Sequence, residues 1–208
     1  MRIRLFAAEV TALEDERNFA RALASVDERR REKVLRLRRA EDRRLSICAG
    51  LLLREGLRLC GAPEGLRIAE GEHGKPYFPD APQWHFSLSH SGRYALCAIG
   101  DAEVGCDIEK TGAANIELAR RFFHPDEVRE LESDPSPEAF CRMWTRKESF
   151  VKATGEGLAR RMDSFSTIPD EVEGLRISSF ADIDGYWCSV CAEASTEKIR
   201  IEQVEIKG

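Results

Sequence analysis

Residues 84–110 read WHFSLSHSGRYALCAIGDAEVGCDIEK, and this stretch decides the fold class. It contains three strand-like runs, near 84–89, 93–99 and 103–109, which predict an antiparallel meander. Further strand patterns lie outward from it at 2–10, 66–70 and 165–206, and helical patterns lie at about 14–24, 27–37, 41–60, 115–122, 125–133 and 137–154. This order is neither strict β-α-β alternation nor all-β, so the sequence predicts a mixed α+β fold.

Composition bounds the size and class of the protein. The chain has 208 residues, of which 42% are hydrophobic and 33% charged, which is enough for one globular domain or two small ones. No run approaches the roughly 18 apolar residues that a membrane-spanning helix needs. The start, MRIRLFAAEV, reaches an acidic residue after a very short apolar run, unlike a secretory leader. We therefore expect a cytoplasmic protein without a membrane partner.

The net charge of −5 hides an asymmetry along the chain. Residues 1–60 carry 15 Lys and Arg against 10 Asp and Glu, whereas residues 61–208 carry 17 against 27. Nine of the basic residues lie between Arg29 and Arg44, a concentration that attracts phosphates or an acidic protein surface. The alternative is an exposed helix face with Glu–Arg pairs. The overall pI of about 5.6 argues against a nucleic-acid partner.

The seven cysteines are scattered and odd in number, which predicts free thiols. Cys188 and Cys191 form a C-x-x-C, but no second pair or His cluster completes a zinc site. The surrounding residues favour a strand, in which residues three apart point to opposite faces. We therefore expect two ordinary core cysteines.

The run VGCDIEK, residues 104–110, is the first candidate site. In a strand, Asp107 and Glu109 project from the same face, so both carboxylates reach one cation. A pair of hard oxygen ligands suits Mg²⁺, which keeps its other positions for water and phosphate oxygens. The alternative is an exposed acidic strand end.

The second candidate site is WTRKESFVK, residues 144–152, on the predicted helix. Glu148 and Lys152 stand together on one flank at i and i+4, whereas Lys147 falls inside the apolar arc. A solvated ion pair and a snorkelling lysine would explain them. A third carboxylate and two cations beside Trp144 also match a metal and phosphate site.

Three shorter motifs add candidate ligands. In HFSLSHSGRY, Ser89 and His90 precede a turn at a glycine, and their hydroxyl and imidazole groups are suitable donors to a phosphate. The alternative is that they form hydrogen bonds within a hairpin turn. A serine nucleophile is not expected, because the glycine that it needs two residues upstream is absent. The tripeptide 74–76, GKP, presents a lysine from a loop and is not a P-loop. Glu127 lies in a predicted first helical turn, where the helix dipole explains it adequately.

Five motifs together resemble the 4′-phosphopantetheinyl transferases of the surfactin-synthetase type: GKP at 74–76, FSLSHSG at 86–92, VGCDIE at 104–109, RRFFHPDE at 120–127 and WTRKESFVKATGEGL at 144–158. The resemblance implies two similar α+β halves, 1–103 and 104–208, related by a pseudo-twofold axis with the active site in the cleft between them. It implies transfer of the phosphopantetheine arm of coenzyme A to a serine of an acyl or peptidyl carrier protein. The other product is adenosine 3′,5′-bisphosphate.

The resemblance also implies roles for individual residues. The Mg²⁺ ligands are expected to be Asp107, Glu109 and Glu148, with Lys152 as the cation on the phosphates. Expected coenzyme A contacts are Gly74, Lys75, Pro76, Ser89 and His90, with Arg30, Lys33 and Ser46 as weaker candidates.

Three further expectations follow from the resemblance and the charge pattern. Glu148, Glu127 or a metal-bound water accepts the proton of the carrier serine. The basic residues of 1–60 meet the acidic carrier, and Phe122 and Phe123 either contact it or pack in the core. We expect a monomer.

Two other classes of function remain open from the sequence. One is a Mg²⁺-dependent phosphohydrolase that acts on a nucleotide. The other is a non-catalytic module that binds a carrier protein or coenzyme A, although such a module would be expected to lack one of the three carboxylates.

Overall fold

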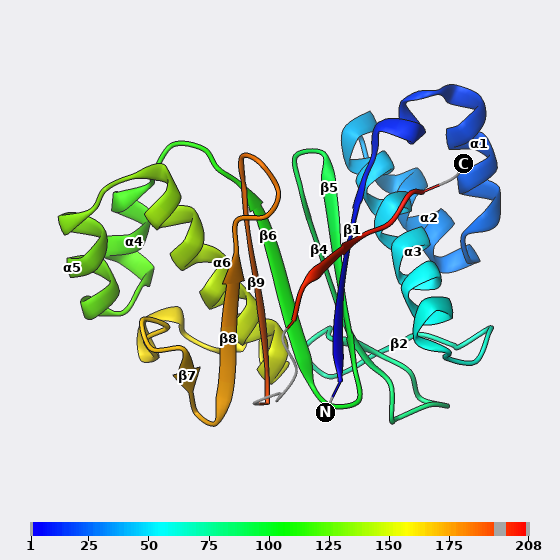
Figure 1. Ribbon diagram of the computed structural model, residues 1–208. Coiled ribbons are helices and arrows are strands. Elements are labelled where there is room, and N and C mark those ends of the chain that lie inside the picture. The colour runs from blue at the N-terminus through cyan, green and yellow to red at the C-terminus, as the bar shows by residue number, and fades with distance from the viewer. Residues whose placement is uncertain (1, 194–198, 207–208) are drawn as a thin grey trace.

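The computed structural model describes residues 2–193 and 199–206, in which two four-stranded sheets lie side by side between two groups of helices (Figure 1). This arrangement confirms the predicted mixed α+β class. The part of the predicted strand tail at 194–198 lies outside the described residues.

The first sheet has the order β10-β1-β5-β4. Its strands are β1 (Ile3–Glu9), β4 (His85–Ser91), β5 (Tyr94–Gly100) and β10 (Ile201–Gln203). Neighbouring strands are antiparallel, except that β10 pairs with β1 in parallel. The C-terminal strand therefore returns to the sheet that the N-terminal strand begins.

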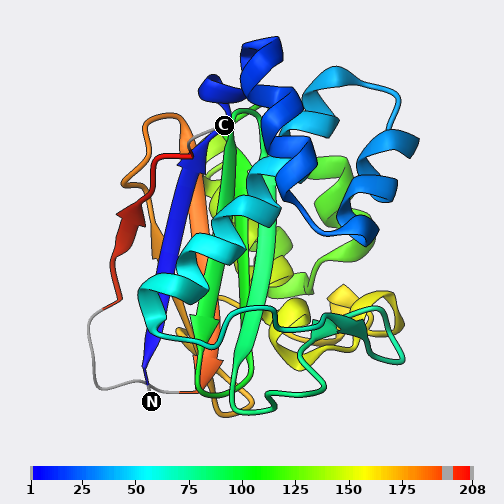
Figure 2. The same ribbon diagram turned by 90° about the vertical axis from the view of Figure 1, so that its right-hand side faces the viewer.

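Helices cover the outer face of the first sheet (Figure 2). They are α1 (Glu16–Ser25), α2 (Glu28–Arg36) and α3 (Ala40–Cys60), after a 3-10 turn at Thr11–Glu14. The side chains of Asp15 and Asp27 accept backbone N–H groups at the starts of α1 and α2, as good N-caps do. Gly61 ends α3 at φ 75°, a left-handed conformation that favours glycine.

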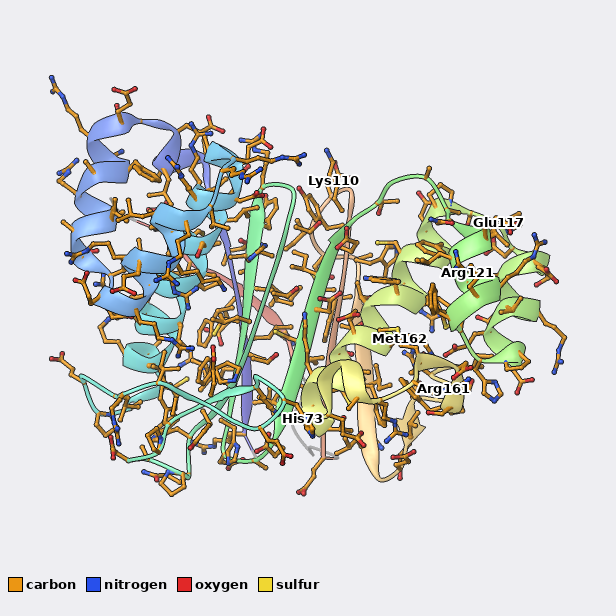
Figure 3. The ribbon with its side chains drawn as sticks, turned by 180° about the vertical axis from the view of Figure 1, so that it is seen from behind. His73, Lys110, Glu117, Arg121, Arg161 and Met162 are labelled. Atoms are coloured by element: carbon orange, nitrogen blue, oxygen red, sulfur yellow. The ribbon has the colours of Figure 1, made fainter. Side chains whose placement is uncertain are left out.

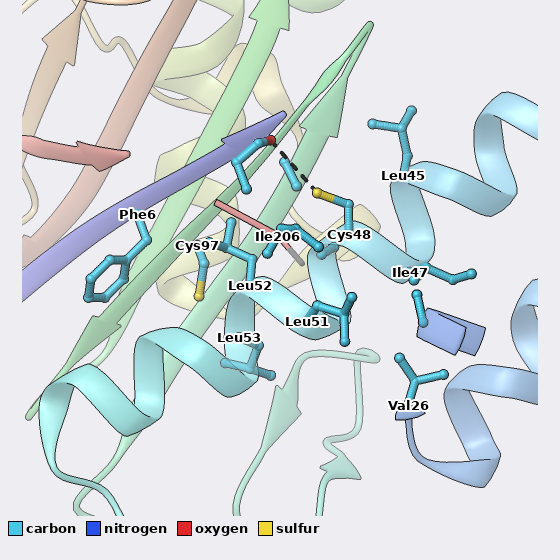
Figure 4. Close-up of a cluster of buried hydrophobic side chains, with 14 of the residues drawn as sticks. Phe6, Val26, Leu45, Ile47, Cys48, Leu51, Leu52, Leu53, Cys97 and Ile206 are labelled. Atoms are coloured by element: carbon cyan, nitrogen blue, oxygen red, sulfur yellow. Dashed lines mark hydrogen bonds between the residues drawn. The ribbon is translucent and has the colours of Figure 1, made fainter. Parts of the chain in front are cut away.

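The core of this half lies between α3 and the sheet (Figure 4). Ile47, Leu52, Phe6 and Cys97 are almost completely buried there. The Cys48 thiol donates to the carbonyl of Ala8 across the gap between α3 and β1. Burial of this apolar surface holds the long helix against the strands.

The second sheet has the order β6-β9-β8-β7. Its strands are β6 (Val104–Lys110), β7 (Glu171–Val172), β8 (Leu175–Phe180) and β9 (Tyr186–Glu193). The predicted meander is therefore wrong at its third strand, because β6 pairs with β9 and not with β5. Alternation predicts that a strand exists, but it does not choose the partner.

Three helices belong to this half: α4 (Ile116–Phe122), α5 (Pro125–Ser133) and α6 (Pro137–Thr154). Two 3-10 turns follow α6, at Gly157–Ala159 and Met162–Ser164. The inner faces of the two sheets share a core that includes Leu5, Leu96, Val104, Cys106, Cys188 and Val190. Cys188 faces this core and Cys191 faces the core under α6, as the C-x-x-C in a strand predicts.

Gly105 sets the distance between β6 and α6. A Cβ atom at this position would lie 2.0 Å from the carbonyl oxygen of Ser149 and 2.3 Å from the backbone nitrogen of Ala153. Only a residue without a side chain allows this approach. The close packing brings the carboxylates of β6 to the flank of α6.

A short hairpin joins α3 to the first sheet. Its strands are β2 (Ala69–Glu70) and β3 (Pro76–Tyr77), and the GKP motif spans the end of its turn and the start of β3. Across residues 2–193 and 199–206, no helix has the length and apolar character needed to cross a membrane.

Candidate active site

Asp107 lies at the centre of the site, on β6 and 5% exposed. Its Oδ1 accepts a hydrogen bond from the Ser89 hydroxyl of β4 at 2.6 Å and another from the Lys152 ammonium of α6 at 2.6 Å. Its Oδ2 is buried and has no protein partner. A buried carboxylate oxygen without a donor is costly, so this atom is a candidate ligand for a cation.

Glu109 and Glu148 lie close enough to Asp107 to interact electrostatically with its carboxylate. Burial raises the pKa of both side chains, and the Asp107 carboxylate raises both further. In the described part of the chain, no three His, Cys, Asp or Glu side chains are gathered tightly enough to hold a metal ion as they stand. Mutual repulsion among three carboxylates and the partnerless Oδ2 are nevertheless the chemistry that a hard divalent cation relieves.

Lys152 is the cation that accompanies these carboxylates. Burial lowers its pKa, but Asp107, Cys106 and Glu148 more than offset that effect, so the pKa ends above its ordinary value. The ammonium is therefore charged at neutral pH. The alternative of a solvated Glu148–Lys152 pair does not hold, because Lys152 bonds to Asp107 instead.

A basic cavity of about 820 Å³ opens on one side of this cluster. Its lining includes six of the expected coenzyme A contacts, namely Arg30, Lys33, Gly74, Pro76, Ser89 and His90, as well as Lys152. Burial lowers the pKa of His90, and Lys33, Lys152 and Arg30 lower it further. His90 is therefore neutral at pH 7 and acts as a hydrogen-bonding group.

Ser46 and Lys75 lie beside this cavity and do not line it. The carbonyl of Ser46 accepts from Arg30 at 3.3 Å, and its buried hydroxyl has no protein partner. The Lys75 ammonium pairs with Glu103 and donates to the carbonyl of Ala153 at 2.9 Å. Lys75 therefore ties the hairpin turn to the end of α6.

An apolar cavity of about 660 Å³ adjoins the basic one. Its lining includes Leu118, Phe122, Trp144, Glu148 and Met162. It shares Lys152, Gly74 and Pro76 with the basic cavity. The two cavities therefore adjoin at Lys152, whose ammonium bonds to Asp107.

Of the side chains labelled in Figure 3, His73, Arg161 and Met162 line the apolar cavity, whereas Lys110, Glu117 and Arg121 lie outside its lining. Figure 3 shows Lys110 at the end of β6, Arg121 on α4, Arg161 and Met162 beyond α6, and His73 in the hairpin turn. Phe122 is 47% exposed beside them, whereas Phe123 is buried against Trp144. The two adjacent phenylalanines therefore have different surroundings.

Glu127 lies apart from the carboxylate cluster and is fully buried. One carboxylate oxygen accepts from the Lys147 ammonium at 2.6 Å and from the backbone of His124, and the other accepts from the backbone and hydroxyl of Thr167. Lys147 is also fully buried and pairs with Glu127, so it neither snorkels nor stands among the cations beside Asp107. Both oxygens of Glu127 are occupied by contacts that join α5 to α6 and to the segment after it.

Residues 14–101 match the family described as 4′-phosphopantetheinyl transferase, N-terminal, and residues 103–201 match the 4′-phosphopantetheinyl transferase superfamily. A 4′-phosphopantetheinyl transferase of Bacillus subtilis is 35% identical over 83% of this chain and 84% of its own length. The chain belongs to the 4′-phosphopantetheinyl transferase superfamily.

Other phosphopantetheinyl transferases are also similar to this chain. Sfp of Bacillus subtilis strain 168 is 33% identical over 83% of this chain and 84% of its own length. The transferase psf-1 of Bacillus pumilus is 29% identical over 96% of this chain and 94% of its own length. The resemblance drawn from the five motifs is thereby confirmed.

Sequence reasoning about this phosphopantetheinyl transferase missed the role of Gly105. The signal was present as a glycine two residues before Asp107, inside a strand pattern, where glycine marks a close approach of another backbone. Because β6 and α6 are far apart in the sequence, the pattern did not indicate that the backbone of α6 is the one that approaches Gly105.

Proposed function

We propose that this phosphopantetheinyl transferase moves the 4′-phosphopantetheine group of coenzyme A to a serine hydroxyl of an apo acyl or peptidyl carrier protein and releases adenosine 3′,5′-bisphosphate. One observation carries the proposal most directly. Lys152, which bonds to Asp107, lines both a basic cavity and an apolar cavity. Coenzyme A has the matching order of groups: a phosphorylated nucleotide, a diphosphate and a long uncharged arm.

In this arrangement the nucleotide phosphates lie in the basic cavity, near Arg30, Lys33 and His90. The arm enters the apolar cavity past Pro76 and Trp144. The diphosphate then lies at the junction, beside Lys152. Positioning of this kind supplies a large part of the rate in phosphoryl transfer, which needs little covalent chemistry from the protein.

Asp107, Glu109 and Glu148 fit a Mg²⁺ ion because they are hard oxygen donors that repel one another and because Oδ2 of Asp107 has no other partner. When bound, the ion neutralises charge on the diphosphate and holds it in place.

The protein's own groups supply the proton and charge chemistry. Lys152 stays protonated and offsets negative charge on the leaving phosphate. Glu148 lines the apolar cavity, where the carrier serine arrives, and its raised pKa makes it a better base than an ordinary carboxylate. Glu127 is not retained as a base, because it is buried and both of its oxygens are hydrogen-bonded.

The carrier docks over the apolar cavity in this proposal. Phe122 offers an exposed apolar contact, and Lys110 and Arg121 offer positive charge to an acidic carrier. The basic residues of α2 line the nucleotide cavity instead. The long helices α3 and α6 each pack on a four-stranded sheet, and we propose that the two halves are related by an approximate twofold axis with the site between them.

The transfer assay tests this function. The protein is incubated with coenzyme A, Mg²⁺ and a panel of apo carriers, and each carrier is weighed by mass spectrometry. The proposal requires at least one carrier to gain the mass of one phosphopantetheine group. Release of adenosine 3′,5′-bisphosphate without any carrier would indicate a phosphohydrolase instead.

A further inference from the structure

We propose that the Glu70 carboxylate is a built-in competitor for the phosphates of coenzyme A and thereby sets a lower affinity for this ligand. The inference rests on the proposed function, because it takes the basic cavity to be the nucleotide site. The hairpin β2–β3, which carries Glu70, is then a determinant of ligand affinity.

Glu70 lies on the wall of the basic cavity that faces α2. It ends β2, and the pairing of Glu70 with Pro76 of β3 holds its backbone in place. Its carboxylate forms an ion pair with Arg29 of α2. Both residues line the cavity, so the pair lies across it from the hairpin to the helix.

The other acidic residues of the lining have local partners on α2 itself. Asp27 caps the start of the helix by accepting from the backbone of Arg30, and Glu32 pairs with Arg36 one turn away. Glu70 is different because it reaches the basic helix from a separate element. Its charge also acts on Lys33, whose pKa is lowered by burial and by Arg30 and Arg29 and is partly restored by Glu70.

The Arg29–Glu70 ion pair is exposed and therefore weak enough for a ligand to open it. Its two side chains are 51% and 58% exposed, and exposed pairs contribute little to stability. A phosphate group that enters the cavity takes over Arg29 and repels the Glu70 carboxylate. Binding therefore carries the cost of opening the pair and of placing two like charges near each other.

The substitution Glu70→Gln tests the inference, because it removes the charge and keeps the shape. Isothermal titration calorimetry with coenzyme A and with adenosine 3′,5′-bisphosphate should show dissociation constants about two- to fivefold lower than for the wild type at low salt. The gain should shrink at high salt, since screening weakens exposed charges. In the transfer assay KM for coenzyme A should fall while kcat stays unchanged.

Glu72→Gln is the matched control, because Glu72 is exposed in the turn of the same hairpin and lies outside the cavity lining. It should leave both dissociation constants unchanged. In an Arg29→Gln background the gain from Glu70→Gln should be smaller, since the cation that Glu70 occupies is gone.

The outcomes distinguish failure of the role proposed for Glu70 from failure of the proposed function. Unchanged or weaker binding by Glu70→Gln, with a wild type that binds both ligands, overturns the inference alone. A wild type that binds neither ligand contradicts the proposed function itself. An equal gain in Glu72→Gln would also overturn the inference, because it would reflect net charge and not the position of Glu70.

Discussion

The ammonium of Lys152 lies 2.6 Å from Oδ1 of Asp107 and joins α6 to β6 at the junction of the two cavities. Ser89 donates to the same oxygen, so one atom links β4, β6 and α6. β4 belongs to the first sheet and β6 to the second. The cluster therefore depends on how the two halves pack, and each of its members can be tested separately.

Asp107→Asn should reduce the transfer rate by about 10- to 100-fold or more, because it removes a carboxylate from the cation site and the acceptor charge beside Lys152. The rate of carrier modification measured by mass spectrometry checks this. Asp184→Asn, at an exposed loop position, is the control and should remain fully active. Near-wild-type activity of Asp107→Asn would remove Asp107 from the site.

Glu109→Gln should stabilise the protein without metal and still lower its activity. The pKa of Glu109 is raised by burial and by Asp107, so its ionised form opposes folding at pH values above the pKa of the unfolded chain. Removing the charge should therefore add up to about 1 kcal/mol at pH 7 and nothing near pH 3, where both states are protonated. Urea unfolding at the two pH values measures the difference. A loss of stability at pH 7 would contradict this electrostatic account.

Lys152→Met should move the acid limb of the pH–rate profile to higher pH. Burial and Asp107 raise the pKa of Glu148, whereas Lys152 lowers it, so loss of the ammonium raises that pKa further. If Glu148 must be ionised to accept a proton, kcat rises with pH through its pKa and the midpoint follows the shift. A profile with the wild-type midpoint would show that Glu148 is not the base. The variant should also lower kcat more than it weakens coenzyme A binding.

Glu127→Gln should destabilise the fold strongly. It leaves the fully buried Lys147 ammonium without its counter-charge, a change that costs about 3–5 kcal/mol in buried pairs. The double variant with Lys147→Met should cost less than the sum of the single changes, and exposed Glu138→Gln should cost almost nothing. A Glu127→Gln protein of normal stability and no activity would instead restore Glu127 as a catalytic base.

Gly105→Ala should separate α6 from β6. The added Cβ would meet the backbone of Ser149 at 2.0 Å, so the helix must move, at a cost of about 1–3 kcal/mol. Gly112→Ala is the control, because its nearest atom would lie at an ordinary 3.9 Å. Thermal unfolding compares the two variants. Equal stability of both variants would show that the close approach is not needed.

Local patterns predicted the elements well and their partners less well. The helix expected over 41–60 runs from Ala40 to Cys60, because its apolar spacing and its terminal glycine are local signals. The strand over 103–109 was also found, but alternation carries no information about the neighbour, and β6 joins the second sheet. Pairing depends on contacts between residues far apart in the chain.

The same limit applies to single side chains. The helical pattern placed Lys147 in an apolar arc without naming its partner Glu127, and the GKP motif presented Lys75 from a loop without naming its partner Glu103. Phe122 ends α4 and is exposed, whereas Phe123 follows the helix in an extended conformation and packs against Phe140 and Trp144 of α6. The candidate residues within one motif could be predicted from the sequence, whereas the ion pairs between residues of different motifs could be identified only from the fold.

The central claim is that Asp107, Glu109 and Glu148 hold one divalent cation together with the diphosphate of coenzyme A. Anomalous diffraction from crystals grown with coenzyme A and Mn²⁺ measures this directly. We expect one anomalous peak within about 2.2 Å of oxygens from the carboxylates and the diphosphate. Well-ordered coenzyme A in the cavities, with no metal peak between these side chains, would contradict the account.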